Sequence, residues 1–471
     1  MRRRWWFLVA VVAALGCLIG GYLYLSRPKP GPAYETGGKP ELSRMDKEKL
    51  LKMVLSGRKE GTLIVERKGD GWTLNTPDPV AIDAARLDDL IYDFTALLAE
   101  RVIDESPTDL GQYGLSPPKA VAEGTSSDGT VKTLSLGDRT PAGNTYYLQV
   151  KGDPKVYTVW MNVGEHFHWT AADLRDKTIA PAINAEEITS LVMRQRNGTV
   201  VEIKEKTTAE AGDLRLGFGK YLMTRPWKSP RGVKSDTQDA VIRGPSGIAI
   251  ADFVDDKPGD LSRYGLDRPW GEVRVSDKAN TIGFLFGGDM TPEKVYFMIR
   301  GRPGLYSVEK SLLAFMDQKP LDMVERFAFI VSIDDVDRID FTAGGKTHVM
   351  TMSRAAKKAE TEGQEDEIVT TFTLDGKVVE DSSFRKLYQS LIGVQIAGEA
   401  PKASAAAPEI IERFILNKGS EREVRVAFAP YDRDFYTVTL NGKTEFVAER
   451  GMLAPVLQKL DILLNGGTIE N

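Results

Sequence analysis

One segment of the sequence recurs at long range, and this duplication constrains the fold more than any other feature. Residues 109–118 read Asp-Leu-Gly-Gln-Tyr-Gly-Leu-Ser-Pro-Pro, and residues 260–269 read Asp-Leu-Ser-Arg-Tyr-Gly-Leu-Asp-Arg-Pro, at an offset of 151. Gly137-Asp138 corresponds to Gly288-Asp289 at the same offset, without a gap. Solenoid repeats are only about 20–50 residues long, so this recurrence predicts a duplicated domain with its own core.

A third and more diverged copy is suggested near the C-terminus. Residues 333–339 parallel residues 184–191, and Phe435–Val438 parallels the segment around Tyr146, although the Tyr-Gly-Leu element is missing there. We therefore expect a β-rich α+β fold with three tandem homologous units of about 150 residues. The predicted division is an N-terminal segment 1–25, a Pro/Gly-rich stalk 26–45, and units at 46–184, 185–333 and 334–466.

Each unit is expected to contain mostly short strands and one helix. Asn197-Gly198 and Asn441-Gly442 interrupt β-rich runs and predict hairpin turns, because both turn positions need a positive φ. A helix is predicted after Asp83, whose apolar face would consist of Leu87, Leu90, Ile91, Phe94, Leu97 and Leu98. Residues 382–391 repeat that pattern, whereas Gly-Pro-Ser-Gly at 244–247 should break the helix of the second unit.

The recurring segment, called the signature below, permits a structural and a functional interpretation. In the structural one, which we favour, leucine and tyrosine anchor in the core, the glycine takes a positive φ, and the last proline starts an edge strand. In the functional one, each tyrosine lines a recurrent groove. The residues concerned are Asp109, Leu110, Tyr113, Gly114, Leu115 and Pro118 in the first copy and Asp260, Leu261, Tyr264, Gly265, Leu266 and Pro269 in the second.

The N-terminus predicts a single transmembrane helix. Trp5–Leu25 is an uncharged run of 21 residues, which as a helix spans about 31 Å, the thickness of a bilayer core. Three preceding arginines predict a cytoplasmic N-terminus and an extracytoplasmic location for the residues after about 30. Gly16 and Gly20 lie on one face of this helix and could allow close contact with another helix. The alternatives are a cleaved signal peptide and lipidation of Cys17.

Charge and motif spacing give little support for nucleic-acid binding, nucleotide binding, metal binding or catalysis. Residues 31–471 carry 57 Lys and Arg against 67 Asp and Glu, a net charge of −10, which does not favour nucleic acid. Gly345-Lys346-Thr347 and Gly442-Lys443-Thr444 lack the first glycine of a phosphate-binding loop. His166 and His168 could share a zinc ion, but no third ligand lies nearby in the sequence. We expect no metal, no cofactor and no enzymatic activity.

The signature resembles that of a bacterial family of unknown function whose members are membrane-anchored. The resemblance extends over residues 60–330, including Trp72, the signature itself, Leu136-Gly137-Asp138 with the tyrosine strand that follows, and residues 173–177. It implies partners rather than an activity, because such proteins are often encoded beside the permease, ATPase and gliding-motility-type auxiliary components of an ABC transporter.

Together these features predict a non-enzymatic accessory or scaffold subunit, anchored in the bacterial inner membrane and exposed to the periplasm. Its expected partners are the lipid bilayer and ABC transporter permease or auxiliary subunits. The alternative is an envelope module that binds a lipid, glycan or peptide in grooves between the units.

Overall fold

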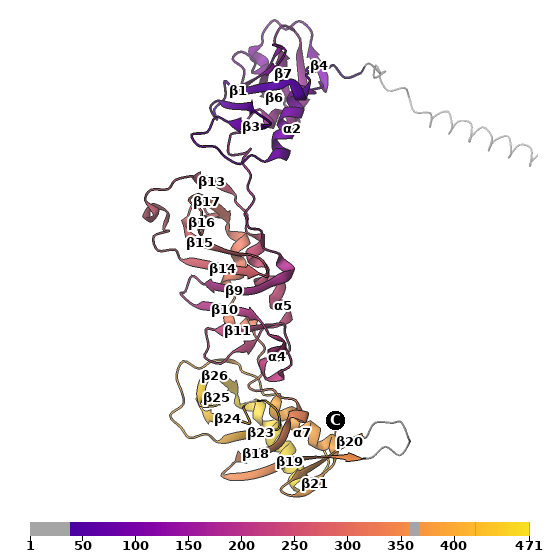
Figure 1. Cartoon of the computed structure of the whole chain (residues 1–471), viewed down its shortest axis with the longest axis vertical. Helices are drawn as coiled ribbons and strands as arrows, with labels where there is room; N and C mark the ends of the chain where they lie inside the picture. The colour runs from indigo at the N-terminus through magenta and orange to yellow at the C-terminus, as the bar shows by residue number, and fades with distance from the viewer. Residues whose placement is uncertain (1–37, 358–366, 420, 471) are drawn as a thin grey trace, which may run out of the picture. The chain divides into compact units, whose positions relative to one another are not determined.

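The computed structural model describes residues 38–357, 367–419 and 421–470. The chain divides into two compact parts, one ending at Asp176 and the other beginning at Lys177. The first part contains one antiparallel sheet and the second contains two (Figure 1). Helices account for only 22% of the structure, so the chain is β-rich.

The first sheet has eight strands in the order β3-β2-β1-β5-β6-β7-β8-β4. Two meanders, β1 to β3 and β5 to β8, meet at the central pair of β1 and β5, where Val54 lies opposite Glu123. The strands are β1 (Leu50–Ser56), β2 (Leu63–Lys68), β3 (Gly71–Leu74), β4 (Arg101–Asp104), β5 (Ala120–Ser126), β6 (Val131–Arg139), β7 (Thr145–Val150) and β8 (Val156–Trp160).

The second sheet has nine strands in the order β12-β11-β10-β9-β14-β15-β16-β17-β13, visible as a ladder in Figure 1. Its central pair joins β9 to β14, where Val192 lies opposite Arg274. The strands are β9 (Ile188–Arg194), β10 (Val200–Glu205), β11 (Tyr221–Arg225), β12 (Arg231–Gly232), β13 (Asp252–Asp255), β14 (Gly271–Asp277), β15 (Thr281–Asp289), β16 (Lys294–Ile299) and β17 (Leu305–Glu309).

The third sheet follows the order β21-β20-β19-β18-β23-β24-β25-β26-β22, with Phe341 opposite Glu412 in its central pair. The strands are β18 (Val336–Ala343), β19 (Lys346–Lys357), β20 (Glu367–Leu374), β21 (Lys377–Val379), β22 (Gly398–Glu399), β23 (Ile410–Leu416), β24 (Glu423–Pro430), β25 (Phe435–Leu440) and β26 (Lys443–Glu449). Apart from the additional edge strands β12 and β21, the three sheets share one strand order.

Two of the predicted helices are confirmed. Helix α2 (Ala84–Thr95) begins after Asp83, whose carboxylate accepts hydrogen bonds from two backbone N–H groups of the first turn. Its apolar face is buried as expected, except that Leu98 lies beyond the helix and is 50% exposed. Helix α7 (Asp381–Ile392) buries the four predicted residues Phe384, Leu387, Tyr388 and Leu391.

The expected break in the second unit is also confirmed. Only the short helix α5 (Ser235–Thr237) forms there, followed by a π-helical turn over residues 238–242 and a 3₁₀ turn over the Gly-Pro-Ser-Gly segment. The Asn441-Gly442 turn has the predicted positive φ at both positions, 48° and 81°. At Asn197-Gly198 only the glycine has a positive φ, because the connection is longer and spans residues 195–199.

Each sheet buries one face under its helices. In β14, Val273 and Val275 face the core, whereas Arg274 between them is exposed on the opposite face. The η8 turn (Lys310–Asp317) adds Leu313, Phe315 and Met316 to the same core. In the third sheet the second covering helix is α8 (Ala454–Leu464). The uncovered face of each sheet is therefore the surface available for binding, and we call it the open face.

The predicted fold class needs correction in its N-terminal element. None of the described helices is long and apolar enough to cross a membrane. The segment Trp5–Leu25, with Gly16 and Gly20, lies outside the described residues. The fold that the structure supports is a β-rich chain of three antiparallel sheets, without a membrane helix among its described elements.

Candidate functional site

The two signature segments form the same loop in the first and second sheets. The Oδ1 atom of Asp109 accepts a hydrogen bond from the backbone N–H of Gly111. In the second copy, the Oδ1 atom of Asp260 accepts one from the backbone N–H of Ser262. Each loop ends in a left-handed glycine, Gly114 with φ 65° and Gly265 with φ 67°. The leucines that follow, Leu115 and Leu266, are buried.

Each signature tyrosine packs edge-to-face against a tyrosine of a neighbouring strand. The ring centroids are 5.0 Å apart both for Tyr113 with Tyr147 and for Tyr264 with Tyr296. The hydroxyl of Tyr113 donates to Asp104 at 2.9 Å, which raises the pKa of this tyrosine. Leu110 and Leu261 are half-buried, Pro118 bridges back to Leu115, and the carbonyl of Pro269 accepts a hydrogen bond from Arg194.

The structure corrects the register of the second copy. A Cβ atom added to Gly137 would lie 2.2 Å from the backbone oxygen of Tyr113, and one added to Gly287 would lie 2.2 Å from that of Tyr264. Gly287 is therefore the counterpart of Gly137, and the offset in this strand is 150. The reason is the hairpin between β14 and β15, residues 278–280, which is one residue shorter than residues 127–130 in the first sheet.

The third sheet has alanine where the other two have this glycine. Ala120 pairs with Leu136, Gly271 with Phe286, and Ile410 with Phe428, so Ala429 occupies the position of Gly137 and Gly287. The third sheet has no Tyr-Gly-Leu loop. Glycine is therefore required at this strand position only where the carbonyl of a signature tyrosine lies against the strand.

A pocket of about 860 Å³ lies beside the signature loop of the first sheet, but most of its charges are paired. Arg139 contacts both Tyr146 and Glu165, and the hydroxyl of Tyr146 donates to Glu165 at 2.9 Å. Lys119 lies 3.3 Å from Asp138. This internal pairing leaves little charge to attract a ligand.

The two neighbouring histidines do not converge on one metal ion. The Nδ1 atom of His166 lies 2.7 Å from Asp93, whereas that of His168 lies 3.5 Å from Glu60. They belong to the end of α3 (Met161–His166) and the turn after it, not to a strand. Within the described ranges, no group of three or more His, Cys, Asp or Glu side chains could hold a metal ion.

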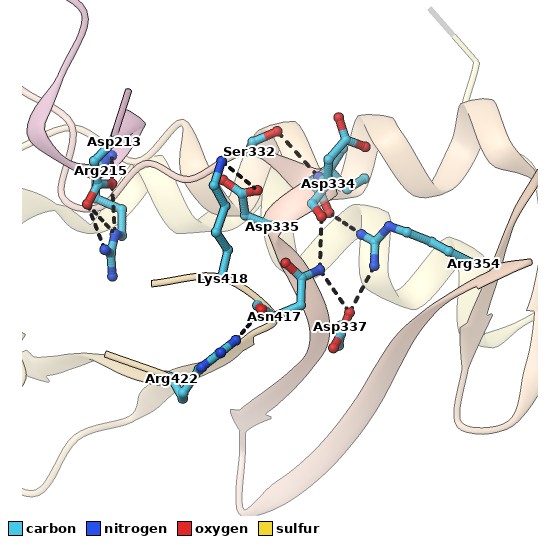
Figure 2. A network of polar contacts seen from close by, with 11 residues as sticks. Asp213, Arg215, Ser332, Asp334, Asp335, Asp337, Arg354, Asn417, Lys418 and Arg422 are labelled. Carbon is cyan, nitrogen blue, oxygen red and sulfur yellow. Dashed lines mark hydrogen bonds and ion pairs between the residues drawn. The ribbon is translucent and has the colours of Figure 1, made fainter. Parts of the chain in front are cut away.

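A polar network joins the first residues of β18 to the end of β23 (Figure 2). The carboxylate of Asp337 accepts hydrogen bonds from Arg354 at 2.9 Å and from Asn417 at 3.0 Å. Arg354 also donates to two backbone carbonyls. Nearby, two side-chain nitrogens of Arg215 donate hydrogen bonds to the carboxylate of Asp213. Apart from the Nη1 atom of Arg215, which is buried without a hydrogen-bond partner, these groups are paired with one another, so we assign the network to the stability of this junction.

One carboxyl group lies in the apolar core of the third sheet. Glu412 is 1% exposed, and its Oε1 atom has no hydrogen-bond partner. Its cross-strand neighbours are Phe341 and Val426, and the equivalent core positions of the other sheets are Ala122 and Val273. Burial raises the pKa of Glu412 to about 8, so the carboxyl is largely protonated at neutral pH.

The open face of the second sheet carries the most strongly charged pocket. This groove, about 1140 Å³ in volume, is lined by four arginines and a single carboxylate, together with valine, alanine and proline side chains. The charged residues are Arg194, Glu272, Arg274, Arg300 and Arg302. An excess of positive charge in a chain of net negative charge is the expected electrostatic signature of an anion-binding surface.

Two of these arginines are fixed by the carboxylate between them. Glu272 accepts hydrogen bonds from Arg194 at 2.8 Å and from Arg300 at 2.9 Å. Burial opposes ionisation of Glu272, but these hydrogen bonds outweigh it and lower the pKa of the carboxyl. Arg302 donates to the backbone oxygen of Ala180 at the rim. The arrangement holds guanidinium groups in place without neutralising all of them.

Sequence reasoning missed this groove. The alternation Val273-Arg274-Val275 indicates that Arg274 faces away from the core. Nothing in the sequence indicates that Arg194 at the end of β9 and Arg300 after β16 lie on the same face with β14 and β15 between them, because that follows from the pairing register.

The model of one protein family, described as "Domain of unknown function (DUF4340)", matches the chain twice, over residues 72–240 and 239–410. No curated protein and no solved structure matches significantly. Each family match covers the later strands of one sheet and the first strands of the next. The prediction of three homologous units is therefore corrected: three sheets share a strand order, but the family model matches two repeats rather than three.

Proposed function

Because the chain belongs to the DUF4340 family of domains of unknown function, we propose its role from the geometry of its sheets. It acts as a non-enzymatic, membrane-anchored, extracytoplasmic accessory or scaffold subunit associated with an ABC-type transport system. The observation that carries the proposal is the repetition of one strand order in three sheets, each with helices on one face only. Accessible sheet faces in tandem suit a scaffold that contacts other proteins.

The equivalent open-face positions differ in charge from sheet to sheet. Glu123, Arg274 and Arg413 occupy the same place on the central strands β5, β14 and β23, and all three are exposed. A shared scaffold with different surface chemistry supports separate contacts for each sheet. The proposed partners are permease or auxiliary subunits of the transporter.

The proposed location is the bacterial inner membrane, with the N-terminus in the cytoplasm and the residues after about 30 in the periplasm. This part of the proposal rests on the sequence alone. Three arginines precede the uncharged segment 5–25, and positive charge is enriched on the cytoplasmic side of membrane segments.

Affinity purification of the tagged full-length protein from native membranes in mild detergent, followed by mass spectrometry, tests the association. We expect transporter subunits to be recovered with the native protein and also when residues 5–25 are replaced by an unrelated anchor. Recovery only with the native segment would move the contact from the sheets to the N-terminal segment. Recovery of no transporter subunit in either preparation would contradict the proposal.

A second candidate function is the binding of a ligand in the envelope. The groove on the second sheet favours it specifically, because its volume is of the size of small-molecule sites and four arginines but only one carboxylate line it. This groove lies on the face of one sheet rather than between units.

A further inference from the structure

Two arginines of the groove lie on either side of a glycine. Arg274 on β14 lies directly opposite Gly283 on β15, and the backbone N–H of Arg300, the residue after β16, donates to the carbonyl of Gly283 at 2.8 Å. Gly283 has no side chain, so β15 places no side chain of its own between the two arginines.

The stem of Arg300 lies across this glycine. A Cβ atom added to Gly283 would meet the Cδ atom of Arg300 at 2.8 Å and its Cγ atom at 3.3 Å. Glycine at this position thus allows the Arg300 side chain to cross above the backbone of β15 and to reach Glu272 on the strand of Arg274. Any larger residue at position 283 would displace the arginine.

The donors of these two arginines are only partly used. Within the described part of the chain, Arg274 has no ion-pair or hydrogen-bond partner and is exposed. Arg300 commits one terminal nitrogen to Glu272, and the rest of its guanidinium is available. Two guanidinium groups that line one groove fit a doubly charged phosphate better than a carboxylate, which carries one charge and two oxygens.

One side of the groove is apolar. Val192 lies opposite Arg274 in the next strand, and Val200 lies opposite Arg194. Both valines are half-buried and line the groove. A ligand whose charged end contacts Arg274 would therefore place an attached hydrocarbon against these side chains.

We propose that this groove binds an amphiphilic phosphate monoester, with the phosphate held by the guanidinium groups of Arg274 and Arg300 and the apolar part against Val192 and Val200. The inference rests on the second candidate function, ligand binding, and is independent of the transport complex. It names the ligand by its chemistry, which a lipid phosphate and a soluble organic phosphate share.

Isothermal titration of the full-length protein, reconstituted in phosphatidylcholine nanodiscs, tests the proposal with octyl phosphate as the probe. We expect saturable binding that weakens with added salt. Arg274→Gln should weaken it about tenfold, the loss expected for one charge-assisted contact. Gly283→Ala should weaken it to a similar degree, although it leaves the charge unchanged. The matched control is Arg263→Gln, which removes an exposed arginine of the same sheet outside the groove and should leave binding unaltered.

Three comparison ligands and two competitors complete the test. Octyl glucoside tests whether the charge is needed, octanoate whether a carboxylate suffices, and inorganic phosphate whether the hydrocarbon matters. Binding of any of these as tight as that of octyl phosphate overturns the assignment. Displacement of octyl phosphate by dihexanoyl phosphatidic acid supports a lipid source, and displacement by glucose 6-phosphate supports a soluble one. Displacement by neither overturns the proposal.

The proposal also fails if octyl phosphate does not bind, or if Arg274→Gln binds it as well as the unaltered protein does. Thermal unfolding of each variant shows whether the sheet is intact, which is expected because Arg274 is exposed. The titration uses the purified chain, whereas the copurification experiment reports on protein partners. A negative result in one therefore leaves the other standing.

Discussion

Replacing Glu412 with leucine is expected to stabilise the third sheet by about 3 kcal/mol at pH 7. Folding transfers this carboxyl into an apolar core, where burial raises its pKa from an ordinary value near 4.5 to about 8. Between these two values the folded state binds a proton that the unfolded state does not bind. The contribution of this proton uptake to the free energy of unfolding is therefore fully present below pH 4.5 and is lost as the pH rises toward 8.

The pH dependence separates this mechanism from a simple gain in apolar contacts. In the unaltered protein, the third sheet should be more stable at pH 5 than at pH 8, by several kcal/mol. Glu412→Gln should remove this difference while leaving a buried amide, so its stabilisation should be smaller than that of Glu412→Leu. The matched control is Glu449→Leu, an exposed glutamate of the same sheet, with an expected effect within about 0.5 kcal/mol.

Hydrogen exchange of β18, β23 and β24 in urea provides the local measurement, because a chain with several cores need not unfold in one step. Equal stability of these strands at pH 5 and pH 8 would show that Glu412 is not buried as described. A loss of stability in Glu412→Leu would show that the carboxyl makes a contact that leucine cannot replace.

Gly287→Ala is expected to destabilise the second sheet by about 3 kcal/mol, because its Cβ atom would collide with a backbone atom. The new carbon would lie 2.2 Å from the carbonyl oxygen of Tyr264. That oxygen cannot move easily, since the loop is fixed by the left-handed Gly265 and by burial of Leu266. Urea unfolding followed by hydrogen exchange of β14 and β15 measures the effect.

The neighbouring glycine is the control for this experiment. A Cβ atom on Gly288 would lie 3.5 Å from the same oxygen, which is an ordinary van der Waals contact. Gly288→Ala should therefore cost less than about 1 kcal/mol. If Gly288→Ala were the more harmful of the two, the offset of 151 would hold in this strand and the register described above would be wrong.

These glycines show what sequence comparison could and could not predict. The duplication, the helices α2 and α7 and the broken helix between them follow from motif recurrence and apolar spacing. The register of β15 does not, because the hairpin before it is one residue shorter than in the first sheet. Gly288-Asp289 therefore matches Gly137-Asp138 in sequence, although Gly287 is the structural counterpart of Gly137. The true correspondence comes from the contacts of Gly137 and Gly287 with the loop carbonyls and from the cross-strand partners Ala120 with Leu136 and Gly271 with Phe286.

The candidate site was hidden for a similar reason. Single strands indicate which residues face away from the core, but a binding surface depends on which of them become neighbours. Arg194 lies at the end of β9, Arg300 directly after β16, and Glu272 between them in β14. Glu412 was hidden differently, because the pattern of β23 places it inside but gives no reason for a carboxyl there.

The central strand pair of each sheet has a consequence for how the chain assembles. Each meander can form from local hairpins, but the two meanders join only after a long loop closes, which is slow and entropically costly. Because the three sheets share one strand order, a meander of one sheet can find a competing partner in another, and such misassembly is typical of tandem chains.

Ion pairs in the central strands discriminate between correct and incorrect partners. Arg194 lies opposite Glu272 in the second sheet, and Asp340 lies opposite Arg413 in the third. Pairing β9 with β23 would instead place Arg194 opposite Ile411, so Glu272 and Asp340 would each lose the cross-strand arginine and keep only the contacts with Arg300 and Arg338. The charges at these positions thus favour pairing of each meander with the second meander of its own sheet over pairing with a meander of another sheet.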